Sequence, residues 1–172
     1  MNNKKIIALR ESGFVKRGHN CRIVGSEYNN AEHQWQCLAL LYKLHPDPSR
    51  NLIWALTFHD VAERYFGDMP ASVNWLRPEL KKAQTQAERT ANEALEVTFE
   101  TSTIEEQWVH AIDRLELLLW VEDQLAFGNQ HIANLATTVR QWFRDSWDQI
   151  PKPVQDFFST YEWQRTSEIE LP

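Results

Sequence analysis

Apolar side chains recur every three or four residues along most of this chain, and this spacing restricts it to a fold of packed helices. Residues 31–44 show the pattern well, because Trp35, Leu38 and Leu41 fall at intervals of three and Leu44 continues the series. Such spacing predicts a helix with one buried face. No segment alternates between apolar and polar residues as a half-buried β-strand does. The sequence therefore predicts an all-α fold, a single-domain helical bundle.

Proline, glycine and small hydroxyl residues mark where the predicted helices begin and end. Pro46 and Pro48 interrupt the helical pattern, and Ser49 is placed to cap the helix that follows. The hydroxyl residues at 101–103, Thr-Ser-Thr, together with Glu105 and Glu106, resemble a cap before the helix that follows. Helices are expected over residues 31–44, 50–66, 78–99, 104–127, 131–148 and 154–165. No linker suggests a second domain, so residues 1–172 are expected to form one domain.

The charge distribution favours a small anionic ligand over a nucleic-acid polymer. The 172 residues carry a net charge of −6, whereas proteins that coat DNA or RNA usually present a broad basic face. Residues 1–25 contain six basic side chains and one acid, a net charge of +5, which leaves −11 for the rest of the chain. A locally basic segment on an acidic body suits a small anion, although an ordinary solvated basic segment would have the same composition.

Cysteine content and hydropathy indicate a cytoplasmic protein with no membrane partner. Cys21 and Cys37 are too few for a disulfide framework and lack the spacing of a zinc ribbon. The longest apolar runs, such as residues 115–121, are far too short to cross a bilayer. The first ten residues lack the apolar stretch of a signal peptide. We therefore expect a cytoplasmic location, which is the host cytoplasm if the chain is phage-encoded.

Several titratable side chains lie inside apolar predicted helices, where they need a compensating partner. His59 and Asp60 follow the largely apolar residues 53–58, and Asp113 lies in a second apolar stretch. Placing an acid there is costly unless its charge is paired or bound to a metal ion. His33 lies on an earlier predicted helix. Each residue alone would more often be a solvated or capping side chain, but two acids and two histidines on separate helices favour a metal site inside the bundle.

Imidazole and carboxylate ligands together suit zinc, cobalt, manganese or iron, and magnesium remains possible. Glu63 lies four residues after His59 and three after Asp60, on the same predicted helical face. A carboxylate in that place could accept a proton from water activated by the metal. An exposed acid that pairs with Arg64 is the alternative interpretation of Glu63.

These residues form an ordered set of motifs that resembles the HD-domain phosphohydrolases. The motifs are AEH at residues 31–33, FHDVAE at 58–63, GDMP at 67–70 and AID at 111–113. The HDxxE and GDxP motifs together resemble the YfbR-like 5'-deoxynucleotidases and their phage relatives. The similarity covers a core motif region of about residues 13–130. The length of the chain and its VKRxH segment resemble the compact phage dATP triphosphohydrolases of the DatZ type.

The resemblance implies a metal site and a set of catalytic acids. One divalent metal ion, with zinc, cobalt or manganese favoured, would be held by His33, His59, Asp60 and Asp113. Glu63 would activate or orient the attacking water. Asp68 would position water or protonate the leaving oxygen.

The segment VKRGH resembles the VxRWH stretch of the family, in which Arg contacts phosphate and Trp walls the base or sugar. The resemblance implies substrate contacts from Lys16, Arg17, Gly18 and His19. Arg17 would be the phosphate ligand, because a guanidinium matches phosphate oxygens. Gly18 stands where Trp is common, which would remove an aromatic wall. Asn74 stands where the family carries Lys, which would remove a positive charge near the phosphates.

The implied activity is metal-dependent hydrolysis of the 5'-phosphoester of a small-molecule deoxynucleotide. We expect dATP, and also dADP and dAMP, to yield deoxyadenosine and the (tri)phosphate, linked to control of a phage nucleotide pool. The alternatives are a 5'-deoxynucleotidase restricted to monophosphates, a cyclic-nucleotide phosphodiesterase, and a non-catalytic helical nucleotide sensor or adaptor. A homo-oligomer, either a dimer or a hexamer, is expected because relatives are commonly oligomeric.

Overall fold

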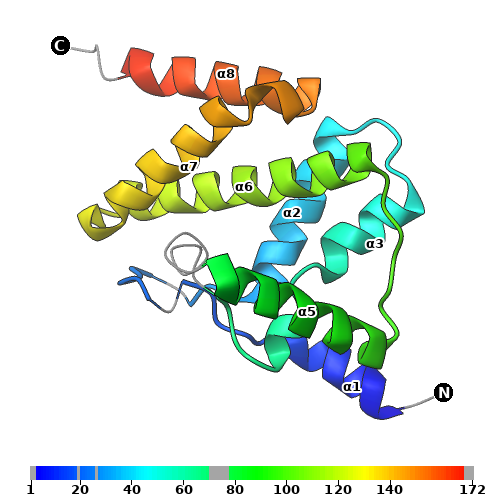
Figure 1. Ribbon diagram of the computed structural model, residues 1–172. Helices are drawn as coiled ribbons and strands as arrows, with labels where there is room; N and C mark the ends of the chain where they lie inside the picture. Colours follow the sequence, from blue (N-terminus) through cyan, green and yellow to red (C-terminus); the bar gives the residue numbers. More distant parts are fainter. Residues whose placement is uncertain (1–2, 19, 26, 70–77, 169–172) are drawn as a thin grey trace.

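The computed structural model describes residues 3–18, 20–25, 27–69 and 78–168, and helices dominate them (Figure 1). The α-helices are α1 (Asn3–Ser12), α2 (Asn30–Leu44), α3 (Arg50–Phe58), α5 (Pro78–Leu95), α6 (Thr103–Ala126), α7 (Ala133–Asp145) and α8 (Lys152–Glu168). Short 3-10 helices are η1 (Val61–Arg64), η2 (Gln130–Ile132) and η3 (Trp147–Gln149). Within these ranges β-pairing is limited to an isolated bridge between Lys16 and Asn29. The predicted all-α fold is confirmed.

Helix α6 is the central element, and it packs against α2, α3, α7 and α8. In Figure 1 it crosses the middle of the molecule, with α8 above it and the pair α1 and α5 below. Leu115 of α6 is fully buried in one cluster with Leu41 of α2, Leu56 of α3 and Phe143 of α7. Burial of each such side chain contributes about 1.5–3 kcal/mol relative to exposure. Helix α6 is thus held from several sides and gives Asp113 a fixed position.

Side-chain caps fix the starts of the helices that carry the site. Asn29 caps α2 by accepting a hydrogen bond from the backbone N–H of Glu32. Ser49 caps α3 in the same way, and Ser102 forms a capping box with Glu105 at the start of α6. Each oxygen satisfies a backbone N–H that has no partner within the helix. The caps predicted at Ser49 and Ser102 are confirmed.

The helix predicted over residues 50–66 is interrupted, and the interruption falls on the HD motif. Helix α3 ends at Phe58, and the backbone of Asp60 has φ −102° and ψ 6°, outside the helical region. The chain then continues as the 3-10 helix η1. Val61, which follows the break, is an apolar residue that is fully buried, so the apolar spacing runs on without a gap. Hydropathy alone therefore does not reveal the break.

The predicted buried face of α2 is confirmed at its centre and wrong at Trp35. Leu41 is fully buried, and Leu38 and Leu44 are partly buried against the same core, but Trp35 is 72% exposed. The fully buried stripe is Asn30, His33, Cys37 and Leu41, with the i, i+3, i+7, i+11 spacing of one helical face. Because two of these residues are polar, a search for apolar residues alone does not find the first part of the stripe.

The helices predicted over residues 78–99 and 131–148 are shorter than expected. Helix α5 ends at Leu95, and Glu96 adopts the left-handed conformation with φ 60° that commonly terminates helices. Residues 131–148 divide into the end of η2, α7 and the start of η3. None of the described helices is both long and apolar enough to cross a membrane.

Candidate metal centre and active site

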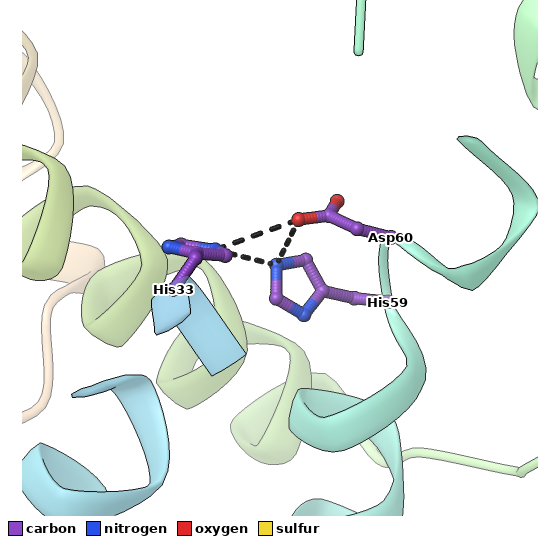
Figure 2. Close-up of side chains that lie close together, drawn as sticks. All are labelled: His33, His59 and Asp60. Carbon is purple, nitrogen blue, oxygen red and sulfur yellow. Dashed lines mark hydrogen bonds and ion pairs between the residues drawn. The ribbon is translucent and has the colours of Figure 1, made fainter. Parts of the chain in front are cut away.

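The four predicted metal ligands come from three helical regions and meet at one place. His33 lies on α2, Asp113 lies on α6, and His59 and Asp60 lie where α3 ends. Figure 2 shows His33, His59 and Asp60 pointing toward one another. The interruption of α3 at Phe58 turns two consecutive side chains toward the same point, which a continuous helix would separate by about 100°.

The ligand atoms lie at the separations that a single metal ion requires. The two Nε2 atoms of His33 and His59 are 3.1 Å apart, and Oδ2 of Asp60 is 3.0 Å from Nε2 of His59. Oδ1 of Asp113 lies 3.3 Å from Nε2 of His33 and 3.7 Å from that of His59. Four ligands placed tetrahedrally at about 2.0–2.1 Å from an ion are about 3.3–3.4 Å apart. The donor set therefore fits a small divalent cation.

Hydrogen bonds on the far side of each imidazole orient both histidines. Nδ1 of His59 lies 2.7 Å from the carbonyl oxygen of Leu56, and Nδ1 of His33 lies 2.5 Å from Oε2 of Glu116. Each acceptor favours a proton on Nδ1, which leaves the lone pair of Nε2 facing the centre. Two lone pairs 3.1 Å apart repel each other unless a cation or proton lies between them. This arrangement again fits a bound metal ion.

Arg17 and Glu63 flank the ligand Asp60. The guanidinium of Arg17 donates a very short hydrogen bond to Oδ2 of Asp60 and lies 3.8 Å from Oε2 of Glu63. Burial tends to raise the pKa of Asp60, but His59 and Arg17 outweigh it and hold the pKa below its usual value. Burial, followed by repulsion from Asp60, raises the pKa of Glu63 to about 8. The two carboxyl groups therefore differ in proton affinity, as the members of an acid–base pair do.

A cavity of about 460 Å³ opens beside these residues. Asp60, Glu63 and Asp113 line its polar part, and Trp120 and Leu135 are among the apolar residues that line the rest. Its volume lies within the range of about 300–1,000 Å³ that is usual for small-molecule sites. The cavity combines two residues of the donor set, Asp60 and Asp113, with Arg17 and an apolar wall, an arrangement suited to a ligand with an anionic and a flat apolar part.

The loop between α1 and α2 places Arg17 and Gly18 at this cavity. The backbone N–H of Arg17 donates to the carbonyl of Tyr28 at 2.9 Å, and the N–H of Gly18 donates to Oδ2 of Asp68 at 3.0 Å. Gln124 of α6 holds the far part of the loop by accepting from the N–H of Val24 and donating to its carbonyl, at 2.8 and 2.9 Å. Asp68 therefore lies at the cavity, tied to the segment expected to bind substrate.

The backbone conformation of Gly18 disfavours a side chain. Its φ is 61°, in the left-handed region, whereas a Cβ atom there would make only an ordinary contact, 3.4 Å from Cη2 of Trp120. The ring of Trp120 stacks on Tyr28 with centroids 4.5 Å apart, and both rings line the cavity. An aromatic wall is therefore present at Gly18, but it comes from α6 and the loop before α2.

Of the remaining predicted substrate contacts, one lies away from the cavity and two lie outside the described residues. Lys16 is an exposed residue whose Nζ lies 2.6 Å from Oε1 of Glu27, and it is not among the residues that line the cavity. His19 and Asn74 lie outside the described residues. The roles proposed for these three side chains therefore remain predictions.

Sequence reasoning missed several residues that the structure brings to the site. Arg114 lines the cavity, with Nη1 3.4 Å from Oδ2 of Asp113, and Asn30 donates to Oε2 of Glu63 at 2.9 Å. Glu116 lies one helical turn after Asp113 and is 1% exposed. A signal for Glu116 was available, because it is an acid inside the apolar run that follows Asp113. Nothing in the sequence points Arg114 toward the cavity.

Comparisons with known proteins agree with this geometry. A sequence model described as 5'-deoxynucleotidase YfbR-like matches residues 14–162. Among solved structures, the chain is similar to the cyanophage S-2L HD phosphohydrolase (DatZ) bound to dA and one catalytic Zn²⁺ ion, with a TM-score of 0.70 and 22% identity over 93% of this chain and 94% of that one. No curated protein matches the sequence significantly. The chain belongs to the YfbR-like 5'-deoxynucleotidase family and is a metal-dependent HD-domain phosphohydrolase.

Proposed function

We propose that this chain hydrolyses the 5'-phosphoester of deoxyribonucleotides, with dATP as the preferred substrate and deoxyadenosine and triphosphate as products. The observation that carries this proposal is the cavity of about 460 Å³, which is lined both by the proposed ligands Asp60 and Asp113 and by the aromatic residue Trp120. The solved DatZ structure, which contains dA and one catalytic Zn²⁺ ion, supports it. We further propose that the reaction serves control of a phage nucleotide pool.

Two arginines that line the cavity support a phosphorylated ligand. Among the described residues that line it, Arg17 and Arg114 are the arginines, and both approach the proposed metal ligands Asp60 and Asp113. Guanidinium groups bind phosphate oxygens through charge-assisted hydrogen bonds. The apolar lining of the cavity, which includes Leu117, Trp120 and Leu135, offers a wall against which a base can pack.

His33, His59, Asp60 and Asp113 are proposed to hold the metal ion. A divalent ion held by them would supply Lewis acidity for a phosphate oxygen and for the attacking water. In its deprotonated form Glu63 accepts the proton of the attacking water, and its raised pKa makes it a stronger base than an ordinary carboxylate. The bond between the first phosphorus and the 5'-oxygen then breaks. Asp68 is proposed to deliver a proton to that oxygen, so that deoxynucleoside leaves.

A turnover screen tests this proposal. Deoxy- and ribonucleotides at each phosphorylation level are incubated with Zn²⁺, Co²⁺, Mn²⁺ or Mg²⁺, and both nucleoside and phosphate products are identified. We expect dATP to give deoxyadenosine and intact triphosphate, faster than ATP does. The Asp113→Ala variant is the control for contaminating phosphatases.

The main alternative is a 5'-deoxynucleotidase that acts on monophosphates, which the matched family description favours. Turnover of dAMP without turnover of dATP would overturn the triphosphate proposal in favour of this alternative. A protein that binds metal and nucleotide but hydrolyses none of them would instead be a nucleotide sensor or adaptor.

A further inference from the structure

Glu116 is a buried carboxylate on the side of His33 that faces away from the metal centre. It lies on α6 and is 1% exposed. A carboxylate in such a place requires partners, because transfer of an unpaired charge from water to a protein interior is very costly. The groups that contact Glu116 therefore indicate its role.

Two donors converge on one oxygen of this carboxylate. Nδ1 of His33 lies 2.5 Å from Oε2 of Glu116, and the hydroxyl of Tyr28 donates to the same oxygen at 2.5 Å. The opposite ring nitrogen, Nε2 of His33, faces His59 and Asp113. The imidazole of His33 thus links a buried carboxylate to the metal centre.

Tyr28 extends this contact to the wall of the cavity. Its ring is 2% exposed and stacks on Trp120. Burial, followed by the charge of Glu116, raises the pKa of the Tyr28 phenol, so the hydroxyl keeps its proton and remains a donor. Tyr28 therefore contacts both Glu116 and Trp120, which lines the cavity.

A second metal site is the competing explanation for the same residues. His33, Cys37 and Glu116 lie close enough together to hold an ion. All three are fully buried, however, and Oε2 of Glu116 already accepts hydrogen bonds from Tyr28 and His33. Nδ1 of His33 is also already directed to Glu116, so a hydrogen-bonding role explains the cluster better.

We propose that Glu116 is a positioning residue that fixes the Nδ1–H tautomer of His33 and strengthens metal binding, with Tyr28 as its second donor. A carboxylate that accepts a proton from a ligating histidine orients the ring and raises the basicity of the ligand. This inference rests on the proposed metal site but is independent of which nucleotide is the substrate.

Metal titration of the metal-free chain tests the inference without an activity assay. Glu116→Gln keeps the shape of the side chain but removes its charge, and we expect it to weaken Co²⁺ or Zn²⁺ binding by about 10–100-fold. Glu122→Gln, on the same helix but paired with Arg140, is the matched control and should bind as the wild type does. Binding by Glu116→Gln within twofold of the wild type would overturn the inference.

Two further measurements test the inference even if Glu116→Gln fails to fold. They are metal binding by Tyr28→Phe and NMR of the wild type. Tyr28→Phe removes one oxygen atom and should weaken metal binding by a few-fold. In the Zn²⁺-loaded wild type, NMR of the histidine side chains should show His33 protonated at Nδ1, with its proton shifted downfield by the carboxylate. A proton on Nε2 of His33 would overturn the inference, whereas a wild type that binds no metal would overturn the proposed metal site itself.

Discussion

Glu63 shows how burial can adapt one carboxyl group to proton transfer. Its side chain is nearly buried, accepts a hydrogen bond from Asn30 and lines the cavity. The sequence left two interpretations open for Glu63, a base at the site or a surface acid paired with Arg64. The structure removes the second, because Glu63 is buried and Arg64 pairs with Glu11.

Replacement of Glu63 should separate catalysis from metal binding. We expect Glu63→Gln to lower kcat by about 100-fold or more, since general base catalysis contributes about 10²–10⁴-fold. Co²⁺ affinity should stay within a few-fold of the wild type, because Glu63 is not one of the proposed ligands. Steady-state kinetics and metal titration check both statements. An unchanged kcat would show that Glu63 has no part in proton transfer.

Arg114 is expected to bind the phosphate chain, since its side chain is 35% exposed and lines the cavity beside Asp113. Arg114→Gln should raise KM for dATP by about tenfold, because hydrogen bonds to charged groups contribute about 1.5–3 kcal/mol. KM for dAMP should rise less, because a monophosphate lacks the outer phosphates. Arg144→Gln, an exposed position on α7, is the control. An equal effect on both nucleotides would contradict this role.

At the scale of elements, the sequence predicted helix starts better than helix interiors. Caps at Ser49 and Ser102 are local, because each depends on one side chain and the next three residues. Helix α3 ends at Phe58, and the two residues after it contact His33 of α2 and Asp113 of α6. These partners lie far away along the chain, so the local sequence of α3 does not predict its end. The exposed face of α2 at Trp35 was likewise predicted wrongly, because polar residues of the site occupy the buried stripe.

The capping box of α6 offers a test at this scale. Ser102→Ala removes the oxygen that accepts from the N–H of Glu105, and we expect it to lower the free energy of unfolding by about 1 kcal/mol. Ser159→Ala, an exposed position inside α8, should change stability by less than about 0.5 kcal/mol. Urea denaturation measures both variants. Equal stability of Ser102→Ala and the wild type would show that the cap does not hold the start of α6.

At the scale of the whole molecule, the site depends on contacts that no single segment specifies. The HD motif and Asp113 were recognisable as residues because their order along the chain is characteristic of the family. Their convergence with Arg17 and Glu116 required the packing of α2, α3 and α6 around one core. Sequence spacing along one helix cannot show which side chain of another helix will face it, so Arg114 and Tyr28 were found only in three dimensions.

The metal content of the purified protein tests the central claim, that four side chains from three helical regions hold one cation. We predict one divalent ion per wild-type chain by mass spectrometry of the metal. Asp60→Ala and Asp113→Ala should retain no ion and no turnover while their circular dichroism stays close to that of the wild type. A wild type without bound metal, or full turnover by either variant, would contradict the claim.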